Sequence, residues 1–244
     1  MTAVTIDIAM SSEKSVTLTY WNGRGRAELI RLVLAFCDVD YEEAVPGLPG
    51  VTHLSEPEHL EHLKESGYLL SGSVPLLCYR GLRLVQSSAI VRFVGATTGR
   101  CGGNTPTEVA KCDMVAETVS DWLSSLGFAF EYGTNGFEPS DEERARLMEG
   151  NAKWLPRFER ILRESGTGLL VGTVLTYADA LALEPLERIA SYDDLAQFPL
   201  LRAFHATLRA EPRLAAWLAS DRRKCKTQDC VAPYKASVEH VLRR

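Results

Sequence analysis

The sequence lacks the features of membrane, secreted and nucleic-acid-binding proteins. It has no uninterrupted apolar run near the roughly 18 residues that a membrane span needs, and residues 1–14 have neither the basic start nor the apolar segment of a secretory signal. Basic residues are not in excess, and the formal net charge of −5 argues against nucleic acid or an anionic membrane as the main partner. None of the six cysteines forms a C-x-x-C pair, so we expect no zinc site and a reducing, cytoplasmic setting.

The composition is that of an ordinary globular protein. Of 244 residues, 45% are apolar and 24% are charged, which excludes disordered, collagenous and coiled-coil classes. The length fits one large domain or two small ones, and either can bury a hydrophobic core.

The first hundred residues predict a small α/β layer. Val16, Leu18 and Tyr20 alternate with threonines as in a short strand, and the apolar spacing that follows Arg24 predicts one amphipathic helix. The remaining order is strand, helix, strand, strand, helix. We expect these elements at residues 41–45, 58–65, 74–79, 82–85 and 87–97.

The rest of the chain predicts helices after a glycine-rich boundary at 97–106. We expect these helices at 108–132, 141–164, 176–191, 199–208, 212–218 and 237–242. Thr176 and Asp179 have the spacing of a capping box. After a polar leader at 1–14, we predict an α/β domain at 15–97, an all-helical domain at 107–220 and an extension at 221–244.

Tyr20 is the first candidate for chemistry, because it ends a predicted strand just before a tight turn. Either it is a core or rim tyrosine, or its hydroxyl donates a hydrogen bond at the mouth of a cleft. With an ordinary pKa near ~10, a phenol remains a donor at neutral pH. Arg24 and Arg26 flank Gly25 next to it. They form either a solvated basic turn or a positive charge that favours an anion bound by the tyrosine.

Two later segments allow similar pairs of interpretations. Ser73-Val74-Pro75 is either a plain strand start or a cis-proline that exposes the Val74 backbone to an extended peptide. Gln86-Ser87 is either an ordinary helix cap or a carboxylate site at a helix N-terminus.

The order of these segments resembles the glutathione site of cytosolic glutathione transferases, and most of all the tyrosine-type classes such as alpha and sigma. The resemblance covers residues 16–218. It implies a thioredoxin-like N-terminal domain, an all-α C-terminal domain, a homodimer, and glutathione as co-substrate without a metal. The matching segments are LTYWNGRGRAE at 18–28, GYL at 67–69, SVP at 73–75, LVQSSAI at 84–90 and LVG at 170–172.

The resemblance also implies roles for individual residues. Tyr20 would hydrogen-bond the glutathione sulfur, and Arg26 would support the thiolate. Asp121 would reach the glutathione of the partner subunit. The other glutathione contacts would be Lys64, Ser73, Val74, Pro75, Gln86 and Ser87. Separately from the resemblance, candidate walls of the pocket for a hydrophobic electrophile are Trp21, Gly25, Phe128 and Tyr132, and the alternative for the aromatic ones is a place in the core.

The implied chemistry is thiolate activation. A free thiol with a pKa near about 8.5 is only a few per cent ionised at neutral pH. Lowering that pKa by about two units needs roughly 2.7 kcal/mol of preferential stabilisation of the anion. One hydrogen bond to a charged acceptor contributes about 1.5–3 kcal/mol, so the Tyr20 hydroxyl could supply most of it.

Other functions remain open at this point. The chain could be a non-catalytic carrier or a crystallin-like protein, or a glutathione-dependent isomerase or peroxidase that uses the same thiolate.

Three positions depart from the family pattern: Ser71 replaces the aromatic residue that anchors the dimer interface, Ser73 replaces glutamine, and Lys153 replaces arginine. His59 with His62, and Cys225 with Cys230, are weaker candidates for a metal site and a redox pair.

Overall fold

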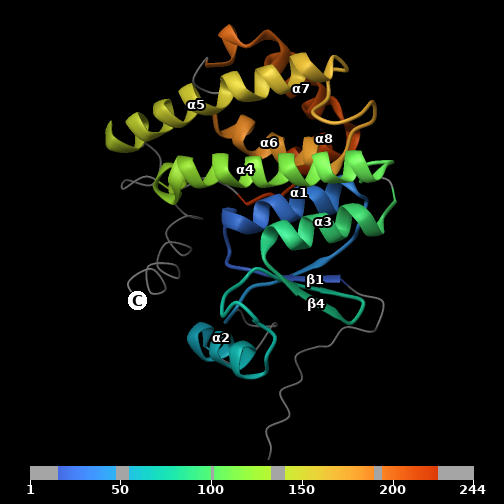
Figure 1. Cartoon of the computed structure of the whole chain (residues 1–244). Coiled ribbons are helices and arrows are strands. Elements are labelled where there is room, and N and C mark those ends of the chain that lie inside the picture. The colour runs from blue at the N-terminus through green and yellow to red at the C-terminus, as the bar shows by residue number, and fades with distance from the viewer. Residues whose placement is uncertain (1–15, 48–54, 100–101, 133–140, 190–193, 225–244) are drawn as a thin grey trace, which may run out of the picture.

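The computed structural model describes residues 16–47, 55–99, 102–132, 141–189 and 194–224. A small sheet and its helices lie below a bundle of longer helices (Figure 1). The predicted leader at 1–14 and helix at 237–242 lie outside the described residues. No helix within the described ranges is both long and apolar enough to span a membrane.

The sheet has four strands in the order β2-β1-β3-β4. β1 pairs with β2 in parallel and with β3 antiparallel, and β3 and β4 form the predicted hairpin. The hairpin turns at Arg80 and Gly81, which both have positive φ, as a tight two-residue turn requires. The strands are β1 (Val16–Thr19), β2 (Glu42–Ala44), β3 (Leu76–Tyr79) and β4 (Leu82–Val85).

Three helices accompany the sheet, in the predicted order. α1 and α3 cover one face, and α2 lies on the other side (Figure 1). The chain after β1 first makes a 3-10 turn, so α1 begins later than the predicted helix. α2 begins at Glu56 because Ser55 and Glu58 form a capping box. The elements are η1 (Gly25–Ala27), α1 (Glu28–Phe36), α2 (Glu56–Glu65) and α3 (Ser87–Thr97).

The remaining helices form the second layer, and their ends agree with the predictions to within a few residues. α6 lies at its centre, packed against α1, α4 and α7. Asp179 fixes the start of α6, since its carboxylate accepts 2.8 Å hydrogen bonds from the Leu170 and Thr176 N–H groups, as the capping-box spacing predicts. The elements are α4 (Pro106–Tyr132), α5 (Asp141–Ser165), α6 (Tyr177–Ile189), η3 (Asp194–Gln197), α7 (Pro199–Ala210) and α8 (Pro212–Ala219).

The packing of α1 joins the two layers. All of its residues except Ala35 are buried, because the sheet lies on one side and α6 and α8 lie on the other. Arg213 extends this contact, since its Nη1 donates to the Phe36 carbonyl at 2.6 Å. The site described below lies at the N-terminal end of α1, where both layers supply side chains.

Glu187 on α6 should make stability depend on pH. Burial opposes its ionisation, but the hydrogen bond from His205 and the charges of Arg209 and Arg223 lower its pKa to about 2, from 4.5. Its ionised form therefore stabilises the fold above pH 4.5, and this contribution is lost as the pH falls towards about 2. We expect Glu187→Gln to lower the free energy of unfolding at neutral pH but to change it little at pH about 2.

Urea unfolding across this pH range measures that difference. The matched control is Glu142→Gln, which removes an exposed partner of Arg146 (58% and 76% side-chain exposure) and should have little effect at any pH. An equal loss for Glu187→Gln at neutral and acid pH would contradict the prediction.

Candidate active site

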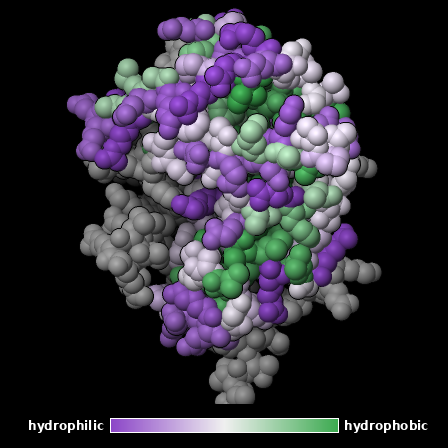
Figure 2. All heavy atoms as spheres, in the orientation of Figure 1, coloured by the Kyte–Doolittle hydropathy of each residue, from purple (hydrophilic) through white to green (hydrophobic). Residues whose placement is uncertain are grey.

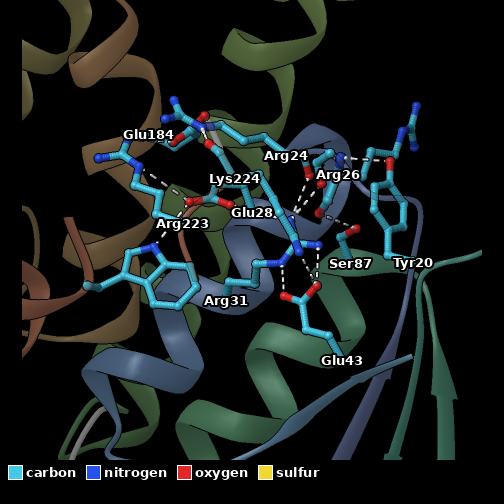
Figure 3. Close-up of polar contacts among 12 residues, drawn as sticks. Tyr20, Arg24, Arg26, Glu28, Arg31, Glu43, Ser87, Glu184, Arg223 and Lys224 are labelled. Atoms are coloured by element: carbon cyan, nitrogen blue, oxygen red, sulfur yellow. Dashed lines mark hydrogen bonds and ion pairs between the residues drawn. The ribbon is translucent and has the colours of Figure 1, made fainter. Parts of the chain in front are cut away.

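Tyr20 lies directly after β1 and is 4% exposed. Its hydroxyl oxygen accepts a 3.0 Å hydrogen bond from the backbone N–H of Arg26, so the phenol meets the start of η1 (Figure 3). The guanidinium of Arg31 lies 6.0 Å from the centre of the tyrosine ring. An N–H that donates to a phenol polarises its O–H bond, which makes the hydroxyl a stronger donor towards an anion.

The turn before α1 is held by two arginines. Arg31 Nη1 donates to the Gly23 carbonyl at 2.8 Å, and Arg24 Nε donates to the Lys224 carbonyl at 2.8 Å. Gly25 adopts a φ of 43°, which favours glycine at the point where the chain turns towards Arg26. The backbone that contacts Tyr20 is therefore fixed both by α1 and by a segment 200 residues away in sequence.

The start of α3 contacts the same turn. Ser87 Oγ donates to the Arg26 carbonyl at 3.1 Å. Gln86, the residue before the helix, has a φ of 72°, a conformation that costs about 1–3 kcal/mol in a residue with a side chain. Strain of this kind concentrates at functional sites, and a helix N-terminus favours a carboxylate.

Two further predicted contacts lie just before β3 and on α2. The Val74–Pro75 peptide bond is cis, as one of the two interpretations of this segment expects, and the pairing of the Val74 backbone with a peptide stays a prediction. Val74 and Pro75 are buried and Ser73 is exposed. Lys64 is exposed on α2, and its Nζ forms an ion pair with Glu61 at 3.1 Å.

A cavity of about 380 Å³ opens beside the turn. Four regions line it: the turn with the start of α1, the start of α3, one face of α4, and α6. The lining residues are Gly25, Arg26, Leu29, Gln86, Ser87, Ser88, Glu117, Ser120, Leu123, Ser124 and Arg188.

A group of charged residues, here called the buried ion cluster, lies behind the turn (Figure 3). Arg31 is fully buried and bonds Glu43 at 2.5 Å and Glu28 at 3.4 Å. Arg223 lies 3.7 Å from Glu28 and 3.5 Å from Glu184. The members are Arg24, Glu28, Arg31, Glu43, Glu184, Glu187, Arg188, Arg223 and Lys224.

The cluster shifts the pKa values of its carboxyl groups in opposite directions. Burial, and then the charge of Glu184, raise the pKa of Glu28. Burial also opposes the ionisation of Glu43, but Arg31 and Lys224 outweigh it and lower the pKa of that carboxyl group. Trp217 Nε1 adds a 3.1 Å hydrogen bond to Glu28 from α8. Side chains of both layers therefore share one electrostatic network next to the cavity.

Comparisons with known proteins decide the family. Residues 16–96 match the model of the glutathione S-transferase N-terminal domain, and residues 120–221 match that of the C-terminal domain. Mouse glutathione S-transferase A4 is 31% identical over 231 residues, which are 93% of this chain and 97% of the mouse protein. The chain belongs to the glutathione S-transferase family.

Other relatives support the same family assignment. Bovine glutathione S-transferase A1 is 34% identical over 87% of this chain and 92% of the bovine protein. The crystal structure of the glutathione S-transferase from Ascaris lumbricoides superposes with a TM-score of 0.69 at 29% identity, covering 87% of this chain and 99% of that one. A nu-class transferase from Haemonchus contortus gives a TM-score of 0.67 at 30% identity, with coverages of 87% and 98%.

The fold of the transferase brings together only part of the predicted site. Gly25, Arg26, Gln86 and Ser87 line the cavity. Trp21, 8% exposed, belongs to the hydrophobic core and is not among the lining residues in the described part of the chain. Asp121 is exposed on α4, and the side chains of Phe128 and Tyr132 lie outside the described residues, so the roles predicted for these three remain predictions.

Sequence reasoning assigned other residues of α4 to the site and missed the α4 and α6 residues that line the cavity. Glu117, Ser120 and Ser124 have helical i, i+3, i+7 spacing, so their common polar face could have been found. The Glu117 carboxylate forms an ion pair with Arg92, with 3.0 Å between Oε1 and Nη2. Arg188 has a weaker signal, a single cation near the end of a helix whose other charged residues are three acids.

Proposed function

We propose that this glutathione transferase binds glutathione next to Gln86 and Ser87 and transfers its thiolate to electrophilic carbon in small apolar molecules, as in detoxification. One observation carries the proposal. The Tyr20 hydroxyl accepts a hydrogen bond from the Arg26 N–H, and Arg26 and Ser87 line the cavity, although Tyr20 is not itself among the lining residues. A phenol held next to the cavity lining in this way is positioned to donate to a sulfur anion.

In the proposed reaction, the glutathione thiol loses its proton to solvent and the sulfur forms a bond to the electrophilic carbon. The leaving group, such as chloride, departs with the electrons of the broken bond. Tyr20 donates its hydroxyl hydrogen bond to the thiolate, and Arg26 adds positive charge. The N-terminus of α1, which begins at Glu28 behind the turn, adds a smaller favourable field.

We assign the rest of glutathione to the flanking segments. The backbone of Val74 before cis-Pro75 would pair with the cysteinyl unit, as in β-strand addition. The start of α3 would hold the γ-glutamyl carboxylate. Lys64 and Ser73, both exposed, would contact the glycyl end.

We also propose a homodimer in which Asp121 reaches the glutathione of the partner subunit. Apolar side chains are exposed over β4 and α3 (Figure 2), where Leu82 is 45% exposed. Leu70 is 92% exposed next to Ser71, the position without an aromatic anchor, so Leu70 supplies an apolar contact there. Cys78 and Cys112 are not in disulfides, which is compatible with the reducing cytoplasm.

A conjugation assay with 1-chloro-2,4-dinitrobenzene tests the proposed function. We expect enzyme-dependent conjugation that saturates with glutathione and exceeds the uncatalysed rate at least about tenfold, a barrier reduction of about 1.4 kcal/mol. S-methyl glutathione, which has no thiol, is the matched control and should inhibit competitively. Glutathione binding without conjugation across several classes of electrophile would contradict the proposal in favour of a carrier.

A further inference from the structure

The chain that follows α8 crosses back to the α/β layer. The amide of Arg223 donates to the Ser220 carbonyl at 3.1 Å, which turns the chain directly after the helix. Arg222, Arg223 and Lys224, here called the C-terminal clasp, then each contact the α/β layer. The match to the C-terminal domain of the family ends at residue 221, so the clasp lies beyond it.

Arg222 fixes the first part of the clasp next to β2. Its Nη2 donates to the Tyr41 carbonyl at 2.7 Å, and its guanidinium lies 4.2 Å from the centre of the Tyr41 ring. A backbone acceptor and an aromatic face together define the position of a planar guanidinium group. Arg223 adds an ion pair with Glu28 at 3.7 Å. The clasp is therefore attached to the α/β layer at two points of its own.

The last residue of the clasp bonds the turn that follows β1 (Figure 3). The Lys224 carbonyl accepts a 2.8 Å hydrogen bond from Arg24 Nε. Arg24 is 8% exposed, and its buried Nη1 has no hydrogen-bond partner among the described residues, so the bond to Lys224 is important for the position of this side chain. Arg24 lies two residues before Arg26, whose N–H donates to the Tyr20 hydroxyl at 3.0 Å.

The Lys224 side chain reaches the same turn by a second route. Its Nζ lies 3.2 Å from Glu43, which also pairs with Arg31. Arg31 in turn donates to the Gly23 carbonyl at 2.8 Å. Neither Arg24 nor any residue of the clasp is among the described residues that line the cavity. An effect of the clasp on the reaction must therefore pass through the turn.

We infer that the C-terminal clasp is a positioning element for the transferase reaction: it fixes Arg24 and thereby holds the Arg26 N–H against the Tyr20 hydroxyl that donates to the glutathione thiolate. This inference rests on the proposed function, because it assumes that donation. A hydrogen-bond donor that is held in place stabilises an anion more than one that must first be oriented. The clasp itself contacts neither substrate in this proposal.

Loosening the clasp should change the pH dependence of conjugation more than its maximum rate. A less well oriented hydroxyl should raise the pKa of the bound thiol by about 0.5–1 unit, part of the effect of losing a hydrogen bond to a charged acceptor. Below the thiol pKa, kcat/KM for the electrophile at saturating glutathione should then fall about three- to tenfold with the thiolate fraction. At higher pH, where the thiol is ionised in both proteins, the rates should converge.

The test uses full-length variants at the two ends of this contact. Arg222→Met with Lys224→Met removes side-chain anchors of the clasp, and Arg24→Met removes the donor to its carbonyl. Ultraviolet absorbance of the thiolate in the glutathione complex gives the thiol pKa, and conjugation of 1-chloro-2,4-dinitrobenzene gives the pH profile. Both variants should show the raised pKa, with less than about a twofold change in the Kd of glutathione.

A double-mutant cycle tests whether the two ends act through one contact. In the Arg24→Met background, the clasp substitutions should cause no further rise of the thiol pKa, because their effect requires the Arg24 side chain. If Arg24→Met does not fold, the clasp variant alone decides, since it keeps Arg24 and the rest of the turn. Its expected result is still a raised thiol pKa and a loss of activity confined to low pH.

Arg213→Met is the matched control. Arg213 also joins the C-terminal helices to the α/β layer, through a 2.6 Å hydrogen bond to the Phe36 carbonyl and a guanidinium 5.6 Å from the centre of the Phe36 ring. Phe36 is the last residue of α1, at the opposite end from the turn. This variant should lose stability, as the clasp variant does, without any change in the thiol pKa.

Each contrary result has a distinct meaning. An unchanged thiol pKa in the clasp variant overturns the inference, and so does an equal loss of activity at every pH, which indicates a structural role. Additive pKa shifts in the cycle, or the same shift in Arg213→Met, also overturn it. Tyr20→Phe, measured alongside, separates the two proposals. If it leaves the thiol pKa unchanged, the proposed mechanism fails together with the inference; if it alone raises the pKa, only the inference fails.

Discussion

Tyr20→Phe is expected to lower kcat/KM for conjugation at least about tenfold while glutathione still binds with nearly unchanged affinity. The substitution keeps the buried ring and removes one hydroxyl, which in the proposed mechanism donates to the sulfur anion. Loss of a hydrogen bond to a charged acceptor costs about 1.5–3 kcal/mol. The pKa of the bound thiol should therefore rise by about one to two units.

The measurement has two parts. Ultraviolet absorbance of the thiolate, titrated against pH in the glutathione complex, reports the pKa of the thiol, and calorimetry reports glutathione affinity. Tyr79→Phe is the matched control, because Tyr79 is a buried tyrosine on β3 whose ring packs edge-on against Phe93, whereas the Tyr20 hydroxyl contacts Arg26. Unchanged turnover in Tyr20→Phe would contradict the proposed mechanism.

Arg31→Met is expected to lower the free energy of unfolding by about 3–5 kcal/mol. Arg31 is fully buried, and its loss leaves the Glu28 and Glu43 carboxylates without their nearest cation. It also removes the donor to the Gly23 carbonyl. Because that turn presents the Arg26 N–H to Tyr20, activity should fall together with stability.

Urea unfolding tests this prediction, with Arg146→Met as the control. Arg146 also pairs with a glutamate, Glu142, but that pair is exposed on α5 and should contribute about 0–1 kcal/mol. Adding Glu43→Gln to Arg31→Met should recover part of the lost stability, since it neutralises one of the carboxylates left without a partner. A loss below about 1 kcal/mol for Arg31→Met would show that the cluster does not stabilise the fold.

Local patterns predicted the elements well, because each pattern acts within a few residues. The capping box of Thr176 and Asp179 spans three residues, and the hairpin at Arg80-Gly81 depends on two. The predicted helix after Arg24 begins later than expected because the tight turn at Gly25 first forms a 3-10 segment. The start of α2 was missed because the capping Ser55 lies before the apolar pattern begins.

The candidate site was predictable where it is built from short motifs. Arg26, Gln86 and Ser87, predicted from segments at the ends of strands and starts of helices, line the cavity, and Tyr20 contacts Arg26, while their roles stay predictions. Trp21 shows the limit of this reasoning, since the sequence does not distinguish an aromatic residue in a pocket wall from one in the core. Arg188 was missed because its place in the cavity depends on how α6 packs against α1.

By itself, the sequence determined the order of the elements, the tight turn after β1, the capping of α6 and, through the family resemblance, which residues are proposed to meet glutathione. Tertiary structure alone decided that Arg24 bonds the backbone of Lys224, that Glu28 faces both Arg31 and Arg223, and that Arg188 lines the cavity. The physical reason is distance along the chain. Polar groups up to 200 residues apart, and charges such as Glu28 and Arg223, meet only when α1 is buried between the sheet and the helical layer, and burial is what makes their interactions strong.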